Sequence, residues 1–472
     1  MDFLELNDLI CSGEKEIVLD SDISLRYADL KGLERINLDV DGLVIDGAGH
    51  CINSDIRKQI FKCSAKGVVL KNLKFQFAFS IDPGSAVCNT GDLEIVDCQF
   101  LYNYSGDAVH NEGKMSIISS QFIYNKGFKG SCVSNAGELL IKDSLFKKNK
   151  AYQGAIYNTS KLTVMDSSFC ENSSMHSGAI DNYGDLEIFK SEFKANKAKV
   201  RGGAMCNKGK IAITDSLFVD NHARYAGAIK NFKAELSVAS STFSQNSARE
   251  GGAILNRWAT LKMEDCRISK NDAETGIIYN HTADLILSRS LLDENECAPL
   301  CNDGKAIVSE CKFSKNKSHA IDNRSKLRVD ESLFEQNEFM WGGAIRSRDE
   351  LEITRSTFLQ NASRFGGAID NFKGNLSVSE CEFAKNKASL GGAIYSERGI
   401  FKMAESSLGE NSADEFGGAV FINGSETSMS ACRFSQNIAV SDGGAIYDWP
   451  DNQRYFECID CSFEDNRPED IS

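Results

Sequence analysis

Short runs of alternating apolar and polar residues recur along the chain, and residues 366–386, GGAIDNFKGNLSVSECEFAKN, show the pattern most clearly. Leu376 and Val378 alternate with polar residues, as in a strand with one buried face. Cys381 and Phe383 also alternate, but one residue out of step with the first pair. A bend between the two pairs would turn all four side chains to one interior. The pattern therefore predicts two short strands per unit, one at GGAIDN and one that bends and ends at the closing Asn.

This unit is an internal repeat of 21 to 29 residues. Sixteen copies close on an Asn, namely Asn103, Asn125, Asn149, Asn172, Asn196, Asn221, Asn246, Asn271, Asn295, Asn316, Asn337, Asn361, Asn386, Asn411, Asn437 and Asn466. The residue three positions before the Asn is Phe, except at Ile268, Leu292 and Leu408. One copy cannot bury its apolar face alone, so stacked copies share an interior. We expect the Asn side chains to form amide ladders between coils.

The repeat predicts an all-β fold, a single-stranded right-handed parallel β-helix solenoid with one copy per coil and about 18 coils. We assign residues 1–35 to an N-terminal cap and entering strands, 36–466 to the β-helix and 467–472 to a short C-terminal tail. Full GGAI/FxxN repeats begin at about residue 82. No linker or second domain is apparent, and we expect a monomer.

A short amphipathic helix is expected at the N-terminus. Phe3, Leu6, Leu9 and Ile10 fall at helical spacing. Solenoid ends need a cover for their open interior. This helix would therefore cap the first coil.

Composition and charge exclude several classes. Gly is frequent, at 38 residues, and Pro is rare, at 4, which suits tight turns between paired strands. The net charge of −14 argues against nucleic acid, whose phosphates need clustered Lys and Arg. No apolar run has the length of a transmembrane helix, so we expect no transmembrane segment. The first residues, MDFLELNDLICSGEKE, are not a secretory signal. The chain therefore stays inside the cell, or its export signal lies elsewhere.

The repeat motifs resemble those of known surface proteins. GGAI followed by FxxN is similar to the double motif of the chlamydial polymorphic outer-membrane proteins. The segments FLELNDLI, LVIDGAGHCI and GVVLKNLKF look like adhesin-like surface proteins of methanogenic archaea. The resemblance covers nearly the whole chain. It implies a right-handed parallel β-helix with a cell-surface or extracellular location and an adhesive, non-enzymatic role.

The sixteen cysteines would suggest disulfides in a secreted protein, but their positions suggest buried thiols. The residue two positions before the Phe is Ser or Cys in every copy, and the Cys members are Cys98, Cys266, Cys311, Cys381, Cys432 and Cys461. A free Cys suits such a small interior position. The pairs Cys458-x-x-Cys461 and Cys297-x-x-x-Cys301 approach metal-ligand spacing, but no second Cys pair or His cluster accompanies them. We therefore predict no metal site.

One residue of each GGAI strand should point outward, namely the residue between the Ile and the Asn, as Asp370 lies between Ile369 and Asn371. Toward the C-terminus these residues form the candidate binding column Asp322, Arg346, Asp370, Tyr395, Phe421 and Tyr447. The first three should stack as acid, base and acid, and the aromatic residues should stack beyond them. Stacked aromatic rings beside charges can hold a sugar or a protein strand. Carboxylates beside a basic residue also occur in the active sites of sugar-cleaving enzymes. A charge ladder that only stabilises the surface would show the same alternation of acidic and basic residues.

A second column, directly before the Ser/Cys position, is mostly acidic. Its acidic members are Asp97, Asp143, Asp166, Asp215, Asp265, Glu310, Glu331, Glu380, Glu405 and Asp460. Calcium between coils would relieve their repulsion, but an exposed bend explains the acids as well. The chain has no nucleophile elbow, phosphate loop, dinucleotide fingerprint or zinc-binding His motif. We therefore predict no cofactor and assign no catalytic residue.

Taken together, the sequence favours a non-enzymatic adhesin-like surface β-helix that binds a glycan or a protein through its outward columns. One alternative is a polysaccharide lyase or glycoside hydrolase of the pectin-lyase-like class. Such enzymes wall a cleft with long loops, whereas copy length here varies only between 21 and 29 residues. The other alternative, suggested by the missing signal, is an intracellular scaffold.

Overall fold

The computed structural model describes residues 1–25, 34–54, 59–80, 82–104, 106–449 and 455–472. The chain falls into two compact units, Met1–Ser237 and Val238–Ser472, which are described separately. Both units are parallel β-solenoids, and together they hold about 17 turns and one short helix. The predicted all-β parallel β-helix is therefore confirmed, close to the expected number of coils. Part of the predicted entering region, residues 26–33, lies outside the described residues.

Each coil has three main strands instead of the two that the sequence suggested. We name the three faces of the solenoid after them: the GGAI face, the long-strand face and the Phe face. In one coil these are β51 (Ile369–Phe372), β52 (Asn375–Ser379) and β53 (Glu382–Ala384). Glu380 adopts a left-handed φ of 54° between β52 and β53. This residue shifts the side-chain alternation by one, so that Leu376, Val378, Cys381 and Phe383 are all buried.

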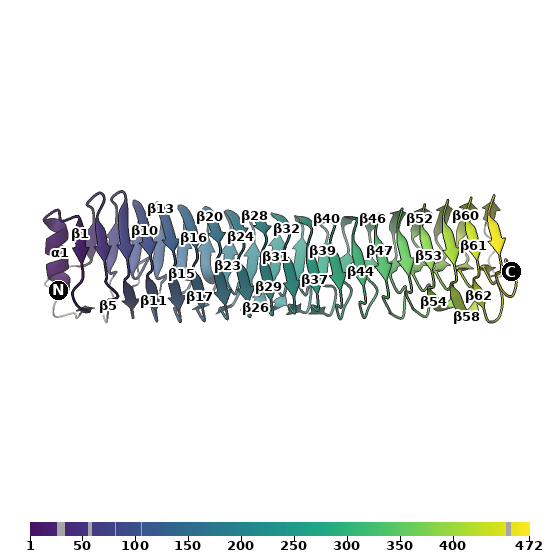
Figure 1. The fold of residues 1–472 in the computed structure, drawn as a ribbon, viewed down its shortest axis with the longest axis horizontal. Helices are drawn as coiled ribbons and strands as arrows, with labels where there is room; N and C mark the ends of the chain where they lie inside the picture. Colours follow the sequence, from purple (N-terminus) through teal and green to yellow (C-terminus); the bar gives the residue numbers. More distant parts are fainter. Residues whose placement is uncertain (26–33, 55–58, 81, 105, 450–454) are drawn as a thin grey trace. The chain divides into compact units, whose positions relative to one another are not determined.

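In the first unit, neighbouring coils pair in parallel on each face (Figure 1). The GGAI face consists of β3 (Ile36–Leu38), β6 (Phe61–Cys63), β9 (Val87–Asn89), β12 (Val109–Asn111), β15 (Gly130–Asn135), β19 (Gly154–Asn158), β23 (Ile180–Asn182), β27 (Met205–Asn207) and β31 (Ile229–Phe232). The long-strand face consists of β1 (Glu16–Val18), β4 (Val44–Asp46), β7 (Val68–Lys71), β10 (Asp92–Val96), β13 (Lys114–Ile118), β16 (Glu138–Lys142), β20 (Lys161–Met165), β24 (Asp185–Phe189) and β28 (Lys210–Thr214). The next long strand, β32 (Glu235–Ala239), includes residues of both units.

The Phe face of the first unit consists of β2 (Ile23–Leu25), β5 (Cys51–Ser54), β8 (Lys74–Gln76), β11 (Gln99–Leu101), β14 (Gln121–Ile123), β17 (Leu145–Lys147), β21 (Ser168–Cys170), β25 (Glu192–Lys194) and β29 (Leu217–Val219). Several coils add a short strand after the closing Asn. In this unit the short strands are β18 (Lys150–Ala151), β22 (Ser173–Ser174), β26 (Lys197–Arg201) and β30 (His222–Tyr225). They pair in parallel and form a small sheet beside the Phe face.

The second unit repeats this plan. Its GGAI face consists of β35 (Ile254–Arg257), β39 (Ile278–His281), β42 (Leu300–Asn302), β45 (Ile321–Asn323), β48 (Ile345–Ser347), β51, β55 (Ile394–Glu397), β59 (Val420–Asn423) and β63 (Ile446–Asp448). Its long-strand face consists of β36 (Thr260–Glu264), β40 (Asp284–Ser288), β43 (Lys305–Ser309), β46 (Lys326–Asp330), β49 (Glu350–Thr354), β52, β56 (Ile400–Ala404), β60 (Glu426–Ser430) and β64 (Phe456–Ile459).

The Phe face of the second unit consists of β33 (Thr242–Ser244), β37 (Arg267–Ser269), β41 (Leu291–Asp293), β44 (Lys312–Ser314), β47 (Leu333–Glu335), β50 (Thr357–Leu359), β53, β57 (Ser407–Gly409), β61 (Arg433–Ser435) and β65 (Ser462–Glu464). Its short strands are β34 (Ser247–Ala248), β38 (Asp272–Ala273), β54 (Lys387–Leu390), β58 (Ser412–Phe416) and β62 (Ile438–Ala439). The predicted tail continues the last coil, because the backbone of Ile471 bridges to Ile446.

The predicted cap helix is present as α1 (Phe3–Cys11). The Asp2 side chain accepts hydrogen bonds from the first-turn backbone, and the Glu5 side chain accepts one from the backbone N–H of Asp2, which completes a capping box. The apolar side of α1 is buried through Phe3, Leu6 and Ile10, and α1 contacts β2 and β3. It therefore covers the first coil, as the helical spacing predicts.

Buried ladders connect successive coils inside each unit. The closing Asn125 donates from Nδ2 to Phe100 O (2.9 Å) and to Asn149 Oδ1 (3.1 Å). Its own backbone N–H donates to the same Asn149 Oδ1 at 2.9 Å. A second ladder runs along the GGAI face, where Asn111 Nδ2 donates to Asn135 Oδ1 at 2.8 Å. The predicted amide ladders are therefore present.

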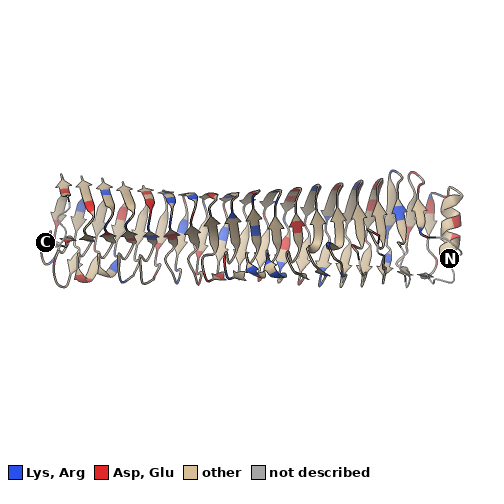
Figure 2. Ribbon diagram, turned by 180° about the vertical axis from the view of Figure 1, so that it is seen from behind, with Lys and Arg blue, Asp and Glu red and all other residues tan. Residues whose placement is uncertain are grey.

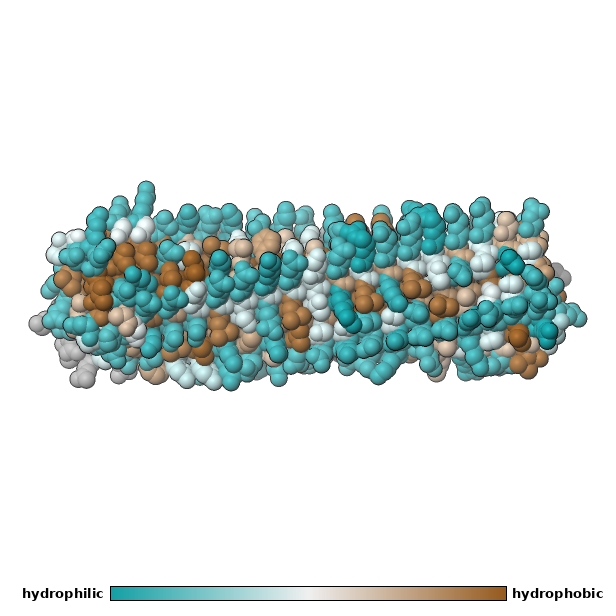
Figure 3. Space-filling model, in the orientation of Figure 1, coloured by the Kyte–Doolittle hydropathy of each residue, from teal (hydrophilic) through white to brown (hydrophobic). Residues whose placement is uncertain are grey.

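Aromatic rings stack beside these ladders and also on the surface. In the interior, the rings of Phe100 and Phe122 lie 4.4 Å apart between centroids and are nearly parallel. On the surface of the first unit, Phe77, Tyr102 and Tyr124 form an exposed stacked row. The face seen in Figure 3 is mostly hydrophilic, with its largest apolar patches over the N-terminal coils.

The interior Ser/Cys position is small, as predicted. Five of the six cysteines at this position, Cys98, Cys266, Cys311, Cys381 and Cys432, are buried, and Cys461 is half-buried. All sixteen cysteines lie among the described residues, and none of them forms a disulfide there. The Cys381 backbone N–H donates to Ser406 Oγ at 3.1 Å, and its thiol contacts Ser379 O at 3.1 Å.

Removing one rung of the closing Asn ladder should destabilise the first unit. Asn196→Ala takes away the acceptor of Asn172 and the donor to Phe169 O. Leaving buried polar groups without partners should lower the free energy of unfolding by about 2 to 4 kcal/mol. Chemical denaturation measures the loss, and Asn7→Ala in α1 serves as the control. Equal stability of both variants would contradict the structural role of the ladder.

Cys381 tests the size of the interior Ser/Cys position. Cys381→Ser should change stability little, because other coils hold Ser there. Cys381→Leu should cost about 1 to 3 kcal/mol through overpacking. Denaturation midpoints of the two variants give the comparison, and alkylation of the native protein should leave Cys381 unmodified until the chain unfolds. A tolerated Leu would refute the tight packing.

Candidate functional site

The candidate column crosses six neighbouring GGAI strands of the second unit. Asp322 on β45 lies in register with Arg346 on β48, and Arg346 lies in register with Asp370 on β51. The column continues in register through Tyr395, Phe421 and Tyr447. The predicted stacking order is therefore confirmed.

The aromatic part of the column is a true stack. The ring centroids of Tyr395 and Phe421 lie 5.3 Å apart, at 11° between planes. Phe421 and Tyr447 follow at 5.4 Å and 21°. Parallel rings at this spacing add packing energy to the strand pairing.

The prediction that this column faces solvent is wrong. Asp322 is 4% exposed, Asp370 2%, Tyr395 6% and Phe421 2%. Only Arg346 and Tyr447 are half-buried. The strand alternation correctly turns these side chains away from the solenoid interior, but another segment of the chain covers them.

The cover is a row of large apolar residues, each directly before a Gly-Gly. We call Trp341, Phe365, Leu390 and Phe416 the cover row, and successive members pair through backbone bridges. Trp341 and Phe365 stack at 4.7 Å and 9°. Phe365 meets Tyr395 edge-on at 5.2 Å, and Phe416 lies 4.6 Å from Tyr447.

The Gly-Gly motif makes the cover possible. Gly366 adopts a left-handed φ of 58°, and a Cβ there would collide with the carbonyl of Ile369. This turn folds the residue before it back over the strand that follows. The sequence signal for the cover row was the large apolar residue before Gly-Gly, which alternation along a strand does not identify.

The charged part of the column forms a partly buried network. Arg346 Nε lies 3.4 Å from Asp370 Oδ2 and the guanidinium lies over the Trp341 ring, 5.2 Å from its centroid. Asp322 instead contacts Arg324 at 2.6 Å and Arg348 at 3.5 Å. The expected acid–base–acid ladder is therefore only half formed. Arg346 pairs with Asp370, whereas Asp322 pairs with Arg324 and with Arg348 of the next coil.

The network extends along the GGAI face toward β39. Arg324 lies 3.6 Å from Asp303, and the Tyr279 hydroxyl donates to Asp303 at 2.5 Å. The same hydroxyl lies 3.0 Å from His281 Nδ1. Figure 2 shows that acidic and basic residues are otherwise spread along both units.

Burial shifts several pKa values in this region. Burial raises the pKa of Asp370 to about 7, although the neighbouring Arg346 acts in the opposite direction. The pKa of Arg346 is lowered, first by burial and then by Arg348. Burial also raises the pKa of Tyr395 to about 12 and lowers that of His319 to about 4. Titratable groups with such shifts often mark functional sites.

A groove lies beside the cover row in the second unit. We call it the second-unit groove; its volume is about 780 Å³, and it is lined by Lys315, Asn316, Lys317, Gln336, Glu338, Phe339, Met340, Ala362, Ser363, Arg364 and Lys387. Phe339 is 38% exposed and Met340 55% exposed. The groove therefore presents apolar side chains next to charged ones at the surface.

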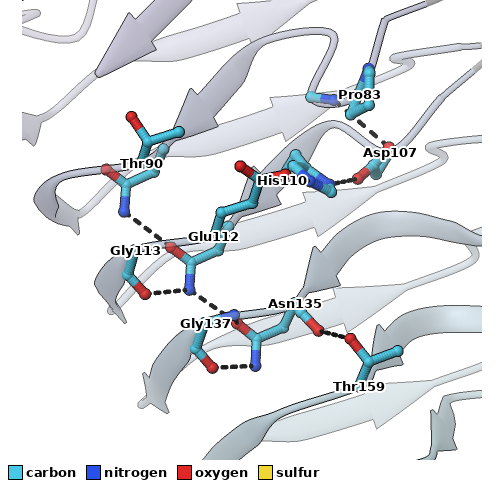
Figure 4. A network of polar contacts seen from close by, with 12 residues as sticks. Pro83, Thr90, Asp107, His110, Glu112, Gly113, Asn135, Gly137 and Thr159 are labelled. Carbon is cyan, nitrogen blue, oxygen red and sulfur yellow. Dashed lines mark hydrogen bonds and ion pairs between the residues drawn. The ribbon is translucent and has the colours of Figure 1, made fainter. Parts of the chain in front are cut away.

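The GGAI face of the first unit carries a smaller polar network. His110 Nδ1 lies 3.0 Å from Asp107, and its Nε2 lies 3.3 Å from Glu112 (Figure 4). The hydrogen bond to Asp107 raises the pKa of His110. Farther along, Asp181 is 2% exposed, and burial raises its pKa to about 6.

The acidic column occupies bends between the long strands and the Phe strands. Its members adopt left-handed φ values, for example 51° at Asp97 and 49° at Asp143. Some pair with neighbouring arginines, as Asp265 does with Arg289 at 3.0 Å. Within the part of the chain that the structure describes, no three His, Cys, Asp or Glu side chains cluster so as to hold a metal ion.

Three segments match a known repeat family. Residues 240–257, 380–397 and 431–448 match the Chlamydia polymorphic membrane protein repeat. Each segment begins one residue before the Ser/Cys position of one coil and runs through the closing Asn to the end of the next GGAI strand. The chain is therefore a parallel β-helix that contains repeats of this kind.

Other comparisons are distant. No curated protein matches the sequence. The periplasmic alginate epimerase AlgG matches with a TM-score of 0.28 and 11% identity, over 76% of this chain and 77% of its own. The PL6 family alginate lyase AlyGC matches with a TM-score of 0.22 and 9% identity, over 98% of this chain and 99% of its own. TM-scores this low bear neither on activity nor on ligand. Among the described residues, no helix is long and apolar enough to cross a bilayer.

The buried Asp370 should make stability depend on pH. Its pKa is about 7 in the folded chain and has an ordinary value of 3.8, so the folded state binds more protons between these pH values. The free energy of unfolding should therefore fall as pH rises from about 4 to about 7, by at most about 1.4 kcal/mol per pH unit, and then level off.

Asp370→Asn should remove this part of the pH dependence. Urea denaturation across the same pH range measures it, and Glu352→Gln, at an exposed acid of the same unit, serves as the control. Identical pH profiles for the native chain and Asp370→Asn would show that folding does not raise the pKa of Asp370.

Proposed function

We propose that this chain is a non-enzymatic, adhesin-like β-helix of the cell surface that binds a glycan or a protein. The binding surface is the second-unit groove together with the cover row and the column beneath it. The observation that carries the proposal is the stacked pair Trp341 and Phe365, with Arg346 and Arg364 against the two rings and exposed Phe339 beside them.

The arrangement suits recognition of a partly apolar ligand. Aromatic rings offer apolar contact area, and the charged rim of the groove offers hydrogen bonds that fix orientation. Arg364 lies over Phe365 at 5.2 Å from its centroid, so a cation stands beside the apolar surface. The same pairing of rings and charges serves a sugar or an extended protein segment.

The column residues would act from below. Arg346 touches Trp341, and Tyr395 touches Phe365 edge-on. Asp322 and Asp370 hold the arginines, and Phe421 and Tyr447 continue the packing toward Phe416. These six residues therefore support the cover row, while the groove residues make the contacts.

The repeat family supports a surface role. The matched repeats are named for a chlamydial membrane protein, and the N-terminal segments resemble adhesin-like proteins of methanogenic archaea. Labelling of intact cells with a membrane-impermeant reagent tests the location. Labelling only after lysis would favour the intracellular scaffold instead.

A polysaccharide lyase or hydrolase is the second candidate. It is favoured by one observation, the Asp370 carboxyl with a pKa of about 7 next to Arg346. However, Asp370 is 2% exposed and lies in register with the buried Tyr395. A general acid has to come within hydrogen-bond reach of its substrate. Buried as it is, Asp370 favours the non-enzymatic function.

Binding should depend on the cover row. Glycan and protein arrays should retain the native chain on a defined set of spots, and Trp341→Ala with Phe339→Ala should weaken that binding about tenfold or more. Trp258→Ala is the matched control, because Trp258 is an exposed Trp of the same unit with an Arg against its ring. Binding that is unchanged in the double variant would refute the proposed surface.

The same preparations decide the enzymatic alternative. Incubation with pectin, polygalacturonate and other uronic polymers, with and without calcium, should produce no new reducing or unsaturated ends. Turnover by the native chain that disappears in Arg346→Ala or Asp370→Asn would establish an enzyme. Melting curves of both variants exclude loss of the fold as the cause.

A further inference from the structure

A basic groove lies over the short strands of the first unit. Its volume is about 900 Å³, and it is lined by Lys126, Gly127, Lys150, Ala151, Tyr152, Ser173, Ser174, Met175, Lys197, Ala198, Lys199, His222 and Arg224. All of these residues belong to Met1–Ser237. It shares no lining residue with the second-unit groove.

The pairing register of the short strands explains the shape of the basic groove. Lys126 bridges to Lys150, which pairs with Ser173, and Ser173 pairs with Lys197. These residues therefore form one row on successive coils, with the small Ser173 between two lysines. Ala151 and Ala198 pair with Ser174 in the neighbouring row. Small side chains in the middle and long exposed ones around them leave a hollow.

The groove concentrates positive charge. Four lysines and Arg224 line it, and the described lining includes no Asp or Glu. Among the described residues, no ion pair joins any of these five cations to a carboxylate. The second-unit groove differs, since Lys317 pairs with Glu296 at 2.7 Å and Lys387 with Asp414 at 3.3 Å. The first unit thus holds five unneutralised cations in a chain whose net charge is −14.

An aromatic edge borders the groove. Phe128 is 65% exposed and Tyr152 is 42% exposed, and their rings stack at 5.2 Å and 8°. His176 closes the far side of Tyr152, edge-on at 5.0 Å. Phe128 and His176 thus occupy the two sides of the Tyr152 ring, which leaves the edge of Tyr152 for contact with a ligand. Nucleic acid bases need an open aromatic face for stacking, whereas ring edges still give a sugar chain an apolar strip.

The spacing of the cations fits a linear polymer. Paired strands of successive coils are roughly 4.8 Å apart, and one pyranose residue extends a polysaccharide by a similar length. A chain lying along the row would meet Lys126 and Lys150 on adjacent coils and Lys197 two coils from Lys150. Lysine, a compact charge with three donors, suits isolated carboxylate or sulfate groups.

We propose that this basic groove binds a linear anionic polysaccharide, with its carboxylate or sulfate groups on Lys126, Lys150, Lys197, Lys199 and Arg224. The sugar rings lie over the small floor residues and against the edge of Tyr152. The polymer runs along the coils, so affinity grows with chain length up to the length of the groove.

Binding assays with immobilised polysaccharides test the proposal on the full chain. Polygalacturonate supplies carboxylates, dextran sulfate supplies sulfates, and dextran is the neutral control. We expect saturable binding to at least one of the two polyanions, none to dextran, and affinity that falls steadily as salt rises. Lys150→Glu with Lys197→Glu should weaken binding about tenfold or more, whereas Lys150→Arg with Lys197→Arg should retain it.

Lys262→Glu with Lys402→Glu is the matched control, because it makes the same charge change at exposed positions of the second unit. It should leave polyanion binding unchanged, as should Trp341→Ala, so this site and the second-unit surface can fail independently. The proposal is overturned if neither polyanion binds, if the control lowers affinity as much as the groove variant, or if single-stranded DNA of equal charge binds as tightly. Circular dichroism and melting curves confirm that each variant is folded.

Discussion

The closing Asn ladder is the interaction on which the rest of the structure depends. Each buried Asn accepts the backbone N–H of the preceding Asn and donates its amide hydrogens to a carbonyl and to the next Asn. Asn172, for example, accepts from Asn149 and donates to Phe146 O and Asn196 Oδ1. A turn buried between apolar layers would otherwise leave backbone groups without partners, at a cost of several kcal/mol per coil. The ladder thereby fixes each turn against its neighbours. Inserted residues occur after the closing Asn, where the short strands and the cover row arise, and in the last coil also between β63 and β64.

Fixed register converts a sequence repeat into columns with constant spacing, and it serves both proposed surfaces. Arg346 can stay beside Asp370 under Trp341 because β48 and β51 cannot slip. Likewise, Lys126 and Lys150 stay on adjacent coils although no ion pair among the described residues neutralises them. The hydrogen bonds between paired strands outweigh the repulsion between like charges on adjacent coils. The scaffold can therefore hold side chains in arrangements that an isolated strand pair would not tolerate.

The sequence predicted several features that depend on alternation and period, although it suggested two strands per coil where the structure has three. The cap helix, the interior Cys381 position, the Asn ladders and the order from Asp322 to Tyr447 followed from residue spacing alone. Alternation shows on which side of a strand a side chain lies, but it does not show whether another segment covers that side. For this reason the burial of Asp370, and of Tyr395 under Phe365, was missed. The partners of Asp322 were missed for a related reason, since arginine side chains reach across positions that strand register keeps apart.

Net charge was a poor guide to the ligand for a similar reason. A total of −14 describes the whole chain, whereas a ligand in the first unit meets only charges within about one Debye length, roughly 10 Å at 0.1 M salt. The charged side chains that line the groove around Lys150 and Lys197 are all positive. Acidic residues elsewhere are screened from this groove and act mainly on solubility. What separates a sugar polyanion from a nucleic acid here is therefore ring geometry: Phe128 and His176 occupy the two sides of the Tyr152 ring, which leaves its edge for a sugar and no free face of that ring for a base.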